Sequence, residues 1–244
     1  MTLRADLISA VLLLTRLPVR GRPTDPAAHA AWAWPVVGLI IGLMTGALGT
    51  GLMLMGISPG LSAGLALALG VIVTGALHED GLADLADGFW GGFDRARRLE
   101  IMRDSRIGTY GVIALTLSLV ARWTLFAEAL SLGTLLPVAI GAAMTSRAAM
   151  AVMMRWLPAA RDDGLSRRTG VPRWKIVAVA MVIGFAGLLL NGIVLAVLAA
   201  TLTVIVTMAT GWLARAKIGG QTGDVLGACQ QIVEITVLAA LTVR

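Results

Sequence analysis

The sequence predicts an all-α protein, a polytopic integral membrane helical bundle of about seven transmembrane helices in a single domain, 1–244. Composition carries this prediction. Hydrophobic residues make up 57% of the 244-residue chain, charged residues only 14%, and the mean hydropathy is +0.85. Soluble domains average about 45–50% apolar and about 25% charged residues. A soluble core could not cover so much apolar surface, so a lipid bilayer is the first expected partner.

Seven apolar stretches approach the roughly 20 residues that a helix needs to cross a membrane. They lie at about 31–56, 60–77, 108–131, 133–154, 175–191, 193–213 and 225–243. A shorter run, 3–17, is broken by Arg16 and followed by Pro18. Because the basic start expected of a signal peptide is weak here and no cleavage site follows, we expect an N-terminal interfacial or re-entrant helix. The 29 glycines would also permit packing between protomers, so a homo-oligomer stays open.

Basic residues divide the connections into two kinds. The three short links near 57–59, 132 and 192 contain none. The connections that contain them are 1–30, 78–107, 155–174 and 214–224. The net charge of +6 therefore follows the positive-inside bias of membrane proteins, and we expect no nucleic-acid partner. With seven spans, the N-terminus and all four basic connections fall on the cytoplasmic side.

Half of the 14 acidic residues lie within 78–107. They are Glu79, Asp80, Asp84, Asp87, Asp94, Glu100 and Asp104. Asp80, Asp84 and Asp87 are four and three residues apart, so on a helix they share one face. Stacked carboxylates repel one another unless a cation bridges them, and magnesium suits such oxygen ligands together with phosphate oxygens. The competing interpretation is a solvated loop whose charges pair with one another.

The second half of this segment adds the groups that bind phosphate. Glu100 and Asp104 are four residues apart, and the arginines among them are Arg95, Arg97, Arg98, Arg103 and Arg106. Carboxylates for a metal and guanidinium groups for phosphate together indicate phosphoryl transfer. The segment would lie in the cytoplasm, beside the ends of two spans.

Other polar residues fall inside predicted spans or at their ends. Charge within a span marks a functional site or a buried pair, and both remain open for Arg122, Glu128, Arg147 and Glu234. Tryptophans near span ends are typical of anchors at the membrane interface. They are Trp32, Trp34, Trp156, Trp174 and Trp212.

Two runs resemble the signature of the cobalamin synthase family, also called adenosylcobinamide-GDP ribazoletransferases. They are TGALHEDGLADLADG at 74–88 and RRLEIMRDSRIGTYG at 97–111. Shorter similar stretches are LTRLPV at 14–19, WAWPVVG at 32–38, SRA at 146–148, RDDG at 161–164 and GGQTGDVLGA at 219–228. The resemblance thus spans nearly the whole chain in order.

The resemblance implies a reaction. Adenosylcobinamide-GDP would be joined to α-ribazole or its 5′-phosphate, releasing GMP and yielding adenosylcobalamin or its phosphate. It also implies magnesium dependence and a place in the bacterial cytoplasmic (inner) membrane. Association with other enzymes of cobalamin biosynthesis is a further hypothesis.

We assign roles on that basis. Asp80, Asp84 and Asp87 would bind magnesium, with Glu79 and Glu100 as second choices. Asp104 would be a further ligand or the base, while Arg103 and Arg106 would stabilise phosphate charge. The substrate-binding candidates are Asp224, which could also be a secondary ligand, and Arg147.

Two other functions remain as alternatives. CDP-alcohol phosphotransferases carry D-x-x-D-G followed by D-x-x-x-D, which Asp84-x-x-Asp87-Gly88 and Glu100-x-x-x-Asp104 match with one substitution. The Ala-Arg pair of that pattern is replaced by Gly91 and Gly92. A transporter would show matching halves and charge near mid-membrane, whereas most charge here lies in the connections.

Overall fold

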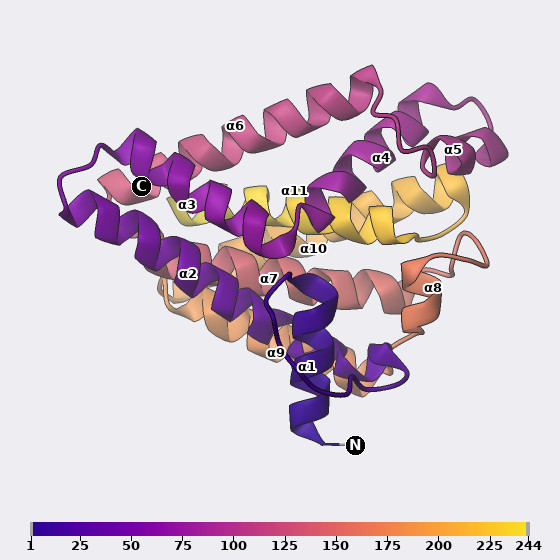
Figure 1. Ribbon diagram of the computed structural model, residues 1–244, viewed down its shortest axis with the longest axis horizontal. Coiled ribbons are helices and arrows are strands. Elements are labelled where there is room, and N and C mark those ends of the chain that lie inside the picture. The colour runs from indigo at the N-terminus through magenta and orange to yellow at the C-terminus, as the bar shows by residue number, and fades with distance from the viewer. Residues whose placement is uncertain (1, 243–244) are drawn as a thin grey trace.

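The computed structural model describes residues 2–242 as a bundle of helices, which confirms the predicted fold class (Figure 1). Within that part of the chain the only extended pairing is a single bridge between Ala159 and Gln221. The elements are α1 (Leu3–Leu14), η1 (Ala27–Ala33), α2 (Trp34–Leu54), α3 (Pro59–Thr74), α4 (Leu77–Gly91), α5 (Arg95–Ile101), α6 (Thr109–Ser131), α7 (Leu135–Trp156), α8 (Leu165–Thr169), α9 (Trp174–Leu189), α10 (Ile193–Ile218) and α11 (Gly223–Thr242).

The number of full-length spans is smaller than predicted. Within residues 2–242, five helical segments are long and apolar enough to cross a membrane: η1 with α2, and then α6, α7, α10 and α11. The predicted span at 60–77 is α3, which has 16 residues and bends by 86° into α4; together the two could form a sixth span. The remaining prediction, 175–191, corresponds to α9, an apolar helix of 16 residues.

The connections gather at two ends of the bundle, as the basic residues predicted. Figure 1 shows the links after α2, α6 and α9 at one end, together with the end of α11. The opposite end carries α5, α8 and the segments 92–108, 157–173 and 219–222, and we call it the basic end.

Helix α7 forms the centre of the bundle and packs against α2, α9 and α11. The α2–α7 contact depends on glycines spaced four residues apart. A Cβ on Gly38 would lie 2.3 Å from the Ala143 carbonyl oxygen, and one on Gly42 would lie 2.6 Å from Ile140 Cα. Small residues at this spacing let two membrane helices approach until their backbones touch.

The break between α3 and α4 positions the acidic residues. Gly75 and Ala76 both have left-handed backbone, with φ of 64° and 56°. Their amides donate to the carbonyls of Ile72 and Val71, the hydrogen-bond pattern of a Schellman motif that ends a helix. The chain then leaves in a new direction. The segment that we predicted to be a cytoplasmic connection therefore begins as helix α4, packed between α11 and α6.

The N-terminal run folds over this break. Helix α1 has 12 residues, about 18 Å of helix, too short to cross a bilayer. After it, the Arg16 amide donates to the Val73 carbonyl at the end of α3. Buried Asp6 accepts hydrogen bonds from Thr24 and from Trp32 Nε1, which joins α1 to η1.

Candidate active site

Helices α4 and α11 meet at two glycines, and this contact brings three carboxylates together. A Cβ on Gly81 would lie 3.0 Å from Asp224 Cα, and one on Gly227 would lie 3.3 Å from His78 Cα. Asp224, in the first turn of α11, is therefore held beside α4. Asp80 and Asp224 both lie near enough to Asp84 for their negative charges to repel it.

A cavity of about 440 Å³ lies between α4, α6 and the segment after α5, and we call it the carboxylate cavity. Glu79, Asp80 and Asp84 line it from α4. Arg103 and Asp104 line it from the facing segment, with Met102, Ser105 and Ile107. The two halves of the acidic segment, about 20 residues apart in sequence, thus meet across one cavity.

The two arginines that follow α5, Arg103 and Arg106, already have carboxylate partners. Arg103 Nη2 lies 2.6 Å from Asp163 Oδ1, in the loop before α8. The Arg106 side chain binds both oxygens of Asp104, at 2.7 to 3.2 Å. These hydrogen bonds lower the pKa of Asp104 to about 2. A carboxylate with such a pKa is a weak base near neutral pH, so the geometry favours an anchoring role for Asp104.

Asp87 does not face the carboxylate cavity. Its oxygens accept hydrogen bonds from the amides of Gly108, at 2.7 Å, and Gly111, at 2.9 Å. These amides lie at the start of α6, where helix N–H groups lack partners within the helix. Asp87 therefore caps α6 from a separate helix. A Cβ on Gly111 would lie 2.4 Å from Asp87 Oδ2, so the cap requires glycine there.

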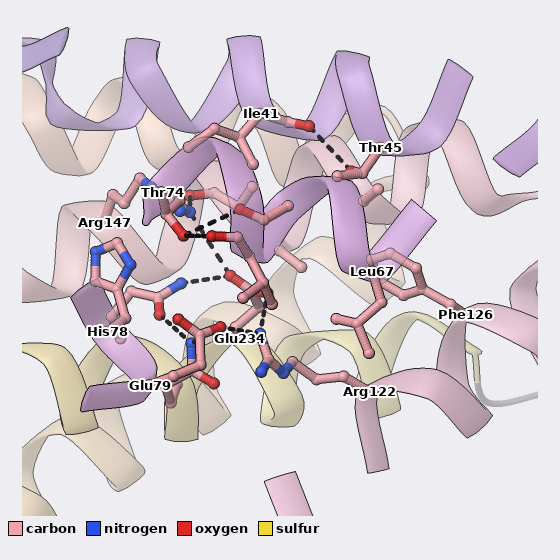
Figure 2. Close-up of a pocket in the computed structure, with 17 residues that line it drawn as sticks. Ile41, Thr45, Leu67, Thr74, His78, Glu79, Arg122, Phe126, Arg147 and Glu234 are labelled. Atoms are coloured by element: carbon pink, nitrogen blue, oxygen red, sulfur yellow. Dashed lines mark hydrogen bonds and ion pairs between the residues drawn. The ribbon is translucent and has the colours of Figure 1, made fainter. Parts of the chain in front are cut away.

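Glu79 belongs to a buried charge cluster, which Figure 2 shows at the centre of the bundle. Its Oε1 lies 2.9 Å from Arg122 Nη1, and Arg122 lies 3.8 Å from Glu234 Oε1. Arg147 lies 3.6 Å from the other oxygen of Glu234. Two glutamates and two arginines balance in charge, and both arginine side chains are at most 3% exposed. Gln230 and Gln231 donate hydrogen bonds to Glu234 and Glu79.

The cluster settles where two predicted site residues lie. Arg147, predicted to contact substrate, lines the small cavity of about 30 Å³ inside this cluster. Among residues 2–242 it does not line the carboxylate cavity or the cavity beside α1. Glu79 lines both that small cavity and the carboxylate cavity. Burial and pairing are the expected reasons for charge at these span positions.

Glu100 lies on the surface. It pairs with Arg97 at 2.9 Å, and its side chain is 69% exposed. It lines another cavity, of about 300 Å³, with Asp87, Asp104 and Arg106, and of these Asp104 also lines the carboxylate cavity. Across residues 2–242, no three His, Cys, Asp or Glu side chains are arranged as a ready-made metal site.

Another cavity, of about 130 Å³, adjoins α4 on the side that faces α1, and we call it the α1-side cavity. Asp80 lines it as well as the carboxylate cavity, and Asp224 lines it from α11. Arg161 Nη2 lies 3.4 Å from Asp224 Oδ2, and Thr222 donates to the same oxygen at 3.1 Å. The RDDG run at 161–164 includes Arg161 in the family resemblance, but sequence spacing could not show that Arg161 pairs with Asp224.

Trp34 also lines the α1-side cavity, and here the sequence prediction was wrong. Its side chain is 1% exposed, because η1 and α1 fold over the start of α2, so it is no interface anchor. Within the described chain its Nε1 has no hydrogen-bond partner. Buried indole N–H groups usually find one, so this donor is free for a ligand.

Comparisons with known proteins agree with the earlier resemblance. The family model described as cobalamin-5-phosphate synthase matches residues 6–242. A Mesorhizobium japonicum protein named adenosylcobinamide-GDP ribazoletransferase is 42% identical over 98% of this chain and 93% of its own length. A Bradyrhizobium diazoefficiens protein of that name is 45% identical, over 96% of this chain and 92% of its own. A third, from Chlorobaculum tepidum, is 38% identical over 98% and 96%. No solved structure matches.

Proposed function

The chain belongs to the cobalamin-5-phosphate synthase family, and from that premise we propose that it transfers the cobinamide-phosphate group of adenosylcobinamide-GDP to α-ribazole or its 5′-phosphate. A ribose hydroxyl attacks the phosphorus on the cobinamide side of the pyrophosphate. A new O–P bond forms, the P–O bond to GMP breaks, and GMP leaves with the bonding electrons. The hydroxyl proton passes to a carboxylate or to water. The product is the completed nucleotide loop of cobalamin.

The observation that carries this proposal is the carboxylate cavity itself, at the basic end of a membrane bundle. It gathers Asp80, Asp84 and Arg103 around a space open to a charged substrate. Phosphoryl transfer requires mainly positioning and electrostatic stabilisation of phosphate oxygens. Arg103 is 52% exposed, and among residues 2–242 its side chain binds only Asp163, so it can exchange that carboxylate for a pyrophosphate oxygen.

Magnesium fits the side chains of this cavity. The donor set is made of oxygen atoms, and within residues 2–242 neither Asp80 nor Asp84 has an ion-pair partner. Magnesium usually binds one or two carboxylates and completes its shell with water and substrate phosphates, so no ready-made three-carboxylate site is needed. Asp80 and Asp84 would hold the ion, with Asp224 nearest to them. The bound ion would neutralise pyrophosphate charge.

The other predicted ligands have different roles in this proposal. Asp87 supports the cavity by capping α6, and Glu79 fixes the first turn of α4 through Arg122. Asp104 and Arg106 pair with each other and so brace the turn next to Arg103 in the segment that lines the cavity. With the pKa of Asp104 at about 2, Asp80 and Asp84 are the better candidates to receive the hydroxyl proton.

The test is GMP release by the purified protein from adenosylcobinamide-GDP with α-ribazole, with magnesium or with EDTA. Asp84→Ala should lower kcat/KM by about 100-fold or more, and Arg103→Ala by a similar order. Glu100→Ala, a surface carboxylate outside the cavity, is the matched control and should stay near wild type. Full activity of Asp84→Ala, or wild-type turnover in EDTA, would contradict the site or the metal.

We also propose that the basic end faces the cytoplasm of a bacterial inner membrane. The support is the segregation of basic residues to one end of the bundle. Cys229 is the single cysteine and is fully buried, so introduced cysteines can be labelled selectively. A membrane-impermeant maleimide added to intact spheroplasts should label Gly192→Cys and spare Glu100→Cys. The reverse pattern would invert the orientation.

A further inference from the structure

The α1-side cavity and the carboxylate cavity both adjoin α4 and share Asp80. Helix α1, the start of α2, the end of α7, α8 and the start of α11 enclose the α1-side cavity. The proposed reaction needs two substrates to meet at one phosphorus. Two cavities that share one carboxylate, Asp80, are a suitable arrangement for that meeting.

The α1-side cavity has an apolar wall that is rigid. The side chains of Leu14, Trp34 and Met154 are each 1% exposed, and Met150 is 5% exposed. Methionine sulfur and an indole ring both make favourable contacts with a flat aromatic ring. Trp34 Nε1, buried and without a partner in the described chain, is a hydrogen-bond donor within this apolar wall. His78, whose Nε2 also has no partner there, lines the cavity from α4.

A second group of lining residues is polar, and we call it the polar wall. Asp80, Arg161 and Asp224 line it, and Ser166 and Thr169 contribute hydroxyl groups from α8. A ligand with an apolar aromatic end and a hydroxylated end would therefore match both walls. In small-molecule sites, apolar walls with a few placed polar groups set orientation in this way.

The two proposed substrates differ in how well they match a cavity with one apolar and one polar wall. One is a corrinoid joined through a pyrophosphate to guanosine. The corrinoid is far too large for about 130 Å³, and guanine carries several polar edge groups that this apolar wall would leave unpaired. The other is a nucleoside whose base is an apolar fused aromatic ring, with one ring nitrogen free to accept a hydrogen bond and a ribose bearing the attacking hydroxyl. Only the base of the second matches an apolar wall with one donor.

We propose, on the basis of the function proposed above, that the α1-side cavity binds the base of α-ribazole. The base lies against Trp34, Met150 and Met154, and its free ring nitrogen accepts from Trp34 Nε1. The ribose extends past Asp80 into the carboxylate cavity, where the pyrophosphate binds. Trp34 and α8 thus determine which bases this enzyme accepts.

Leu165→Trp tests this assignment without disturbing the bundle core. Leu165 lines the cavity from α8 and is 51% exposed, so a larger side chain can close the cavity from outside. Val171→Trp is the matched control, because Val171 is 56% exposed in the segment after α8 and does not line the cavity. Trp34→Phe is a second variant, which keeps an aromatic ring and removes the N–H donor.

Two measurements are needed. The first is the dissociation constant of α-ribazole by calorimetry in EDTA, where no turnover interferes. The second is the KM of each substrate with magnesium. Leu165→Trp should weaken α-ribazole binding at least tenfold. Trp34→Phe should weaken it about tenfold, the effect of one lost hydrogen bond. Val171→Trp and the KM for adenosylcobinamide-GDP should stay near wild type.

The outcomes separate this inference from the function on which it rests. Unchanged α-ribazole affinity in Leu165→Trp and Trp34→Phe, with normal wild-type turnover, would overturn the cavity assignment and leave the reaction intact. An equal rise in both KM values would also overturn it, since the cavity would then serve both substrates. If the wild-type protein neither binds α-ribazole nor releases GMP, the proposed function fails and the assignment falls with it.

Discussion

Asp84 and Asp87 lie three residues apart on α4, yet we expect alanine to weaken magnesium binding at the first position and protein stability at the second. Asp84 lines the carboxylate cavity beside other carboxylates. Asp87 binds the Gly108 and Gly111 amides at the start of α6. The same substitution therefore removes a proposed ligand at one position and a helix cap at the other.

The magnitude for Asp87→Ala follows from the two hydrogen bonds. The Gly111 amide is buried, so its lost bond to a charged acceptor costs about 1.5–3 kcal/mol. The Gly108 amide is only part-buried, so water can replace that bond. Loss of negative charge at the α6 N-terminus adds about 0.5–1 kcal/mol. The sum, about 2–4 kcal/mol, corresponds to a fall in Tm of about 4–16 °C.

The assay is thermal unfolding in detergent, followed by circular dichroism, together with the magnesium concentration that gives half-maximal GMP release. Asp87→Ala should lose stability with an unchanged magnesium midpoint. Asp84→Ala should keep its Tm, because repulsion from its neighbours is relieved, and should raise the midpoint about tenfold or more. An Asp87→Ala protein of wild-type Tm whose magnesium midpoint rises as far as that of Asp84→Ala would refute the cap.

Three further predictions concern burial, packing and pH. Arg122→Gln leaves the Glu79 carboxylate buried without its ion-pair partner and should lower the free energy of unfolding by about 3–5 kcal/mol. Arg97→Gln breaks an exposed pair and should change the free energy of unfolding by less than about 1 kcal/mol. Equal losses for the two variants in chemical denaturation would contradict the burial argument. Gly42→Ala forces α2 away from α7 and should cost about 1–3 kcal/mol, whereas Gly51→Ala, with no atom within 4 Å of its Cβ, should be neutral or slightly stabilising. Arg106 lowers the pKa of Asp104 to about 2, below its ordinary value of about 3.9, so the stability from this pair is complete above about pH 4 and is lost as pH falls through 2. Asp104→Asn should therefore leave the acid limb of the pH–rate profile between pH 5 and 7 unmoved. A shift of that limb would make Asp104 the titrating base.

The sequence was sufficient for the membrane fold and for the end of the bundle where the chemistry gathers, because both depend on composition and charge along the chain. It also indicated that Asp80 and Asp84 share a helix face. It could not show that Asp87 binds α6, since spacing defines a face but not what packs against it. The α3–α4 break escaped prediction because Ala76, a good helix former, adopts left-handed backbone there.

The pairing of buried charges was equally beyond sequence reasoning. Arg122 and Glu234 were recognised as span charges with two open interpretations. Their partners lie on other helices; Glu79 and Arg122 are 43 positions apart in the sequence, and no local pattern links such positions. Trp34 was misinterpreted for a similar reason: its place near a span end is typical of an anchor, and only the fold of α1 and η1 covers it.

The break after α3 also makes bilayer thickness relevant to the carboxylate cavity. Helix α3 has 16 residues, about 24 Å of helix, against a hydrocarbon layer of about 30 Å. When its far end sits at the lipid boundary, its last residue and the first turn of α4 lie roughly 6 Å inside the hydrophobic layer. A mismatch of this kind is relieved by thinning the membrane or tilting the helix. Tilting of α3 would carry the first turn of α4 with it and move Asp80 relative to Arg103, so the acyl-chain length of the surrounding lipids becomes a variable of the reaction geometry.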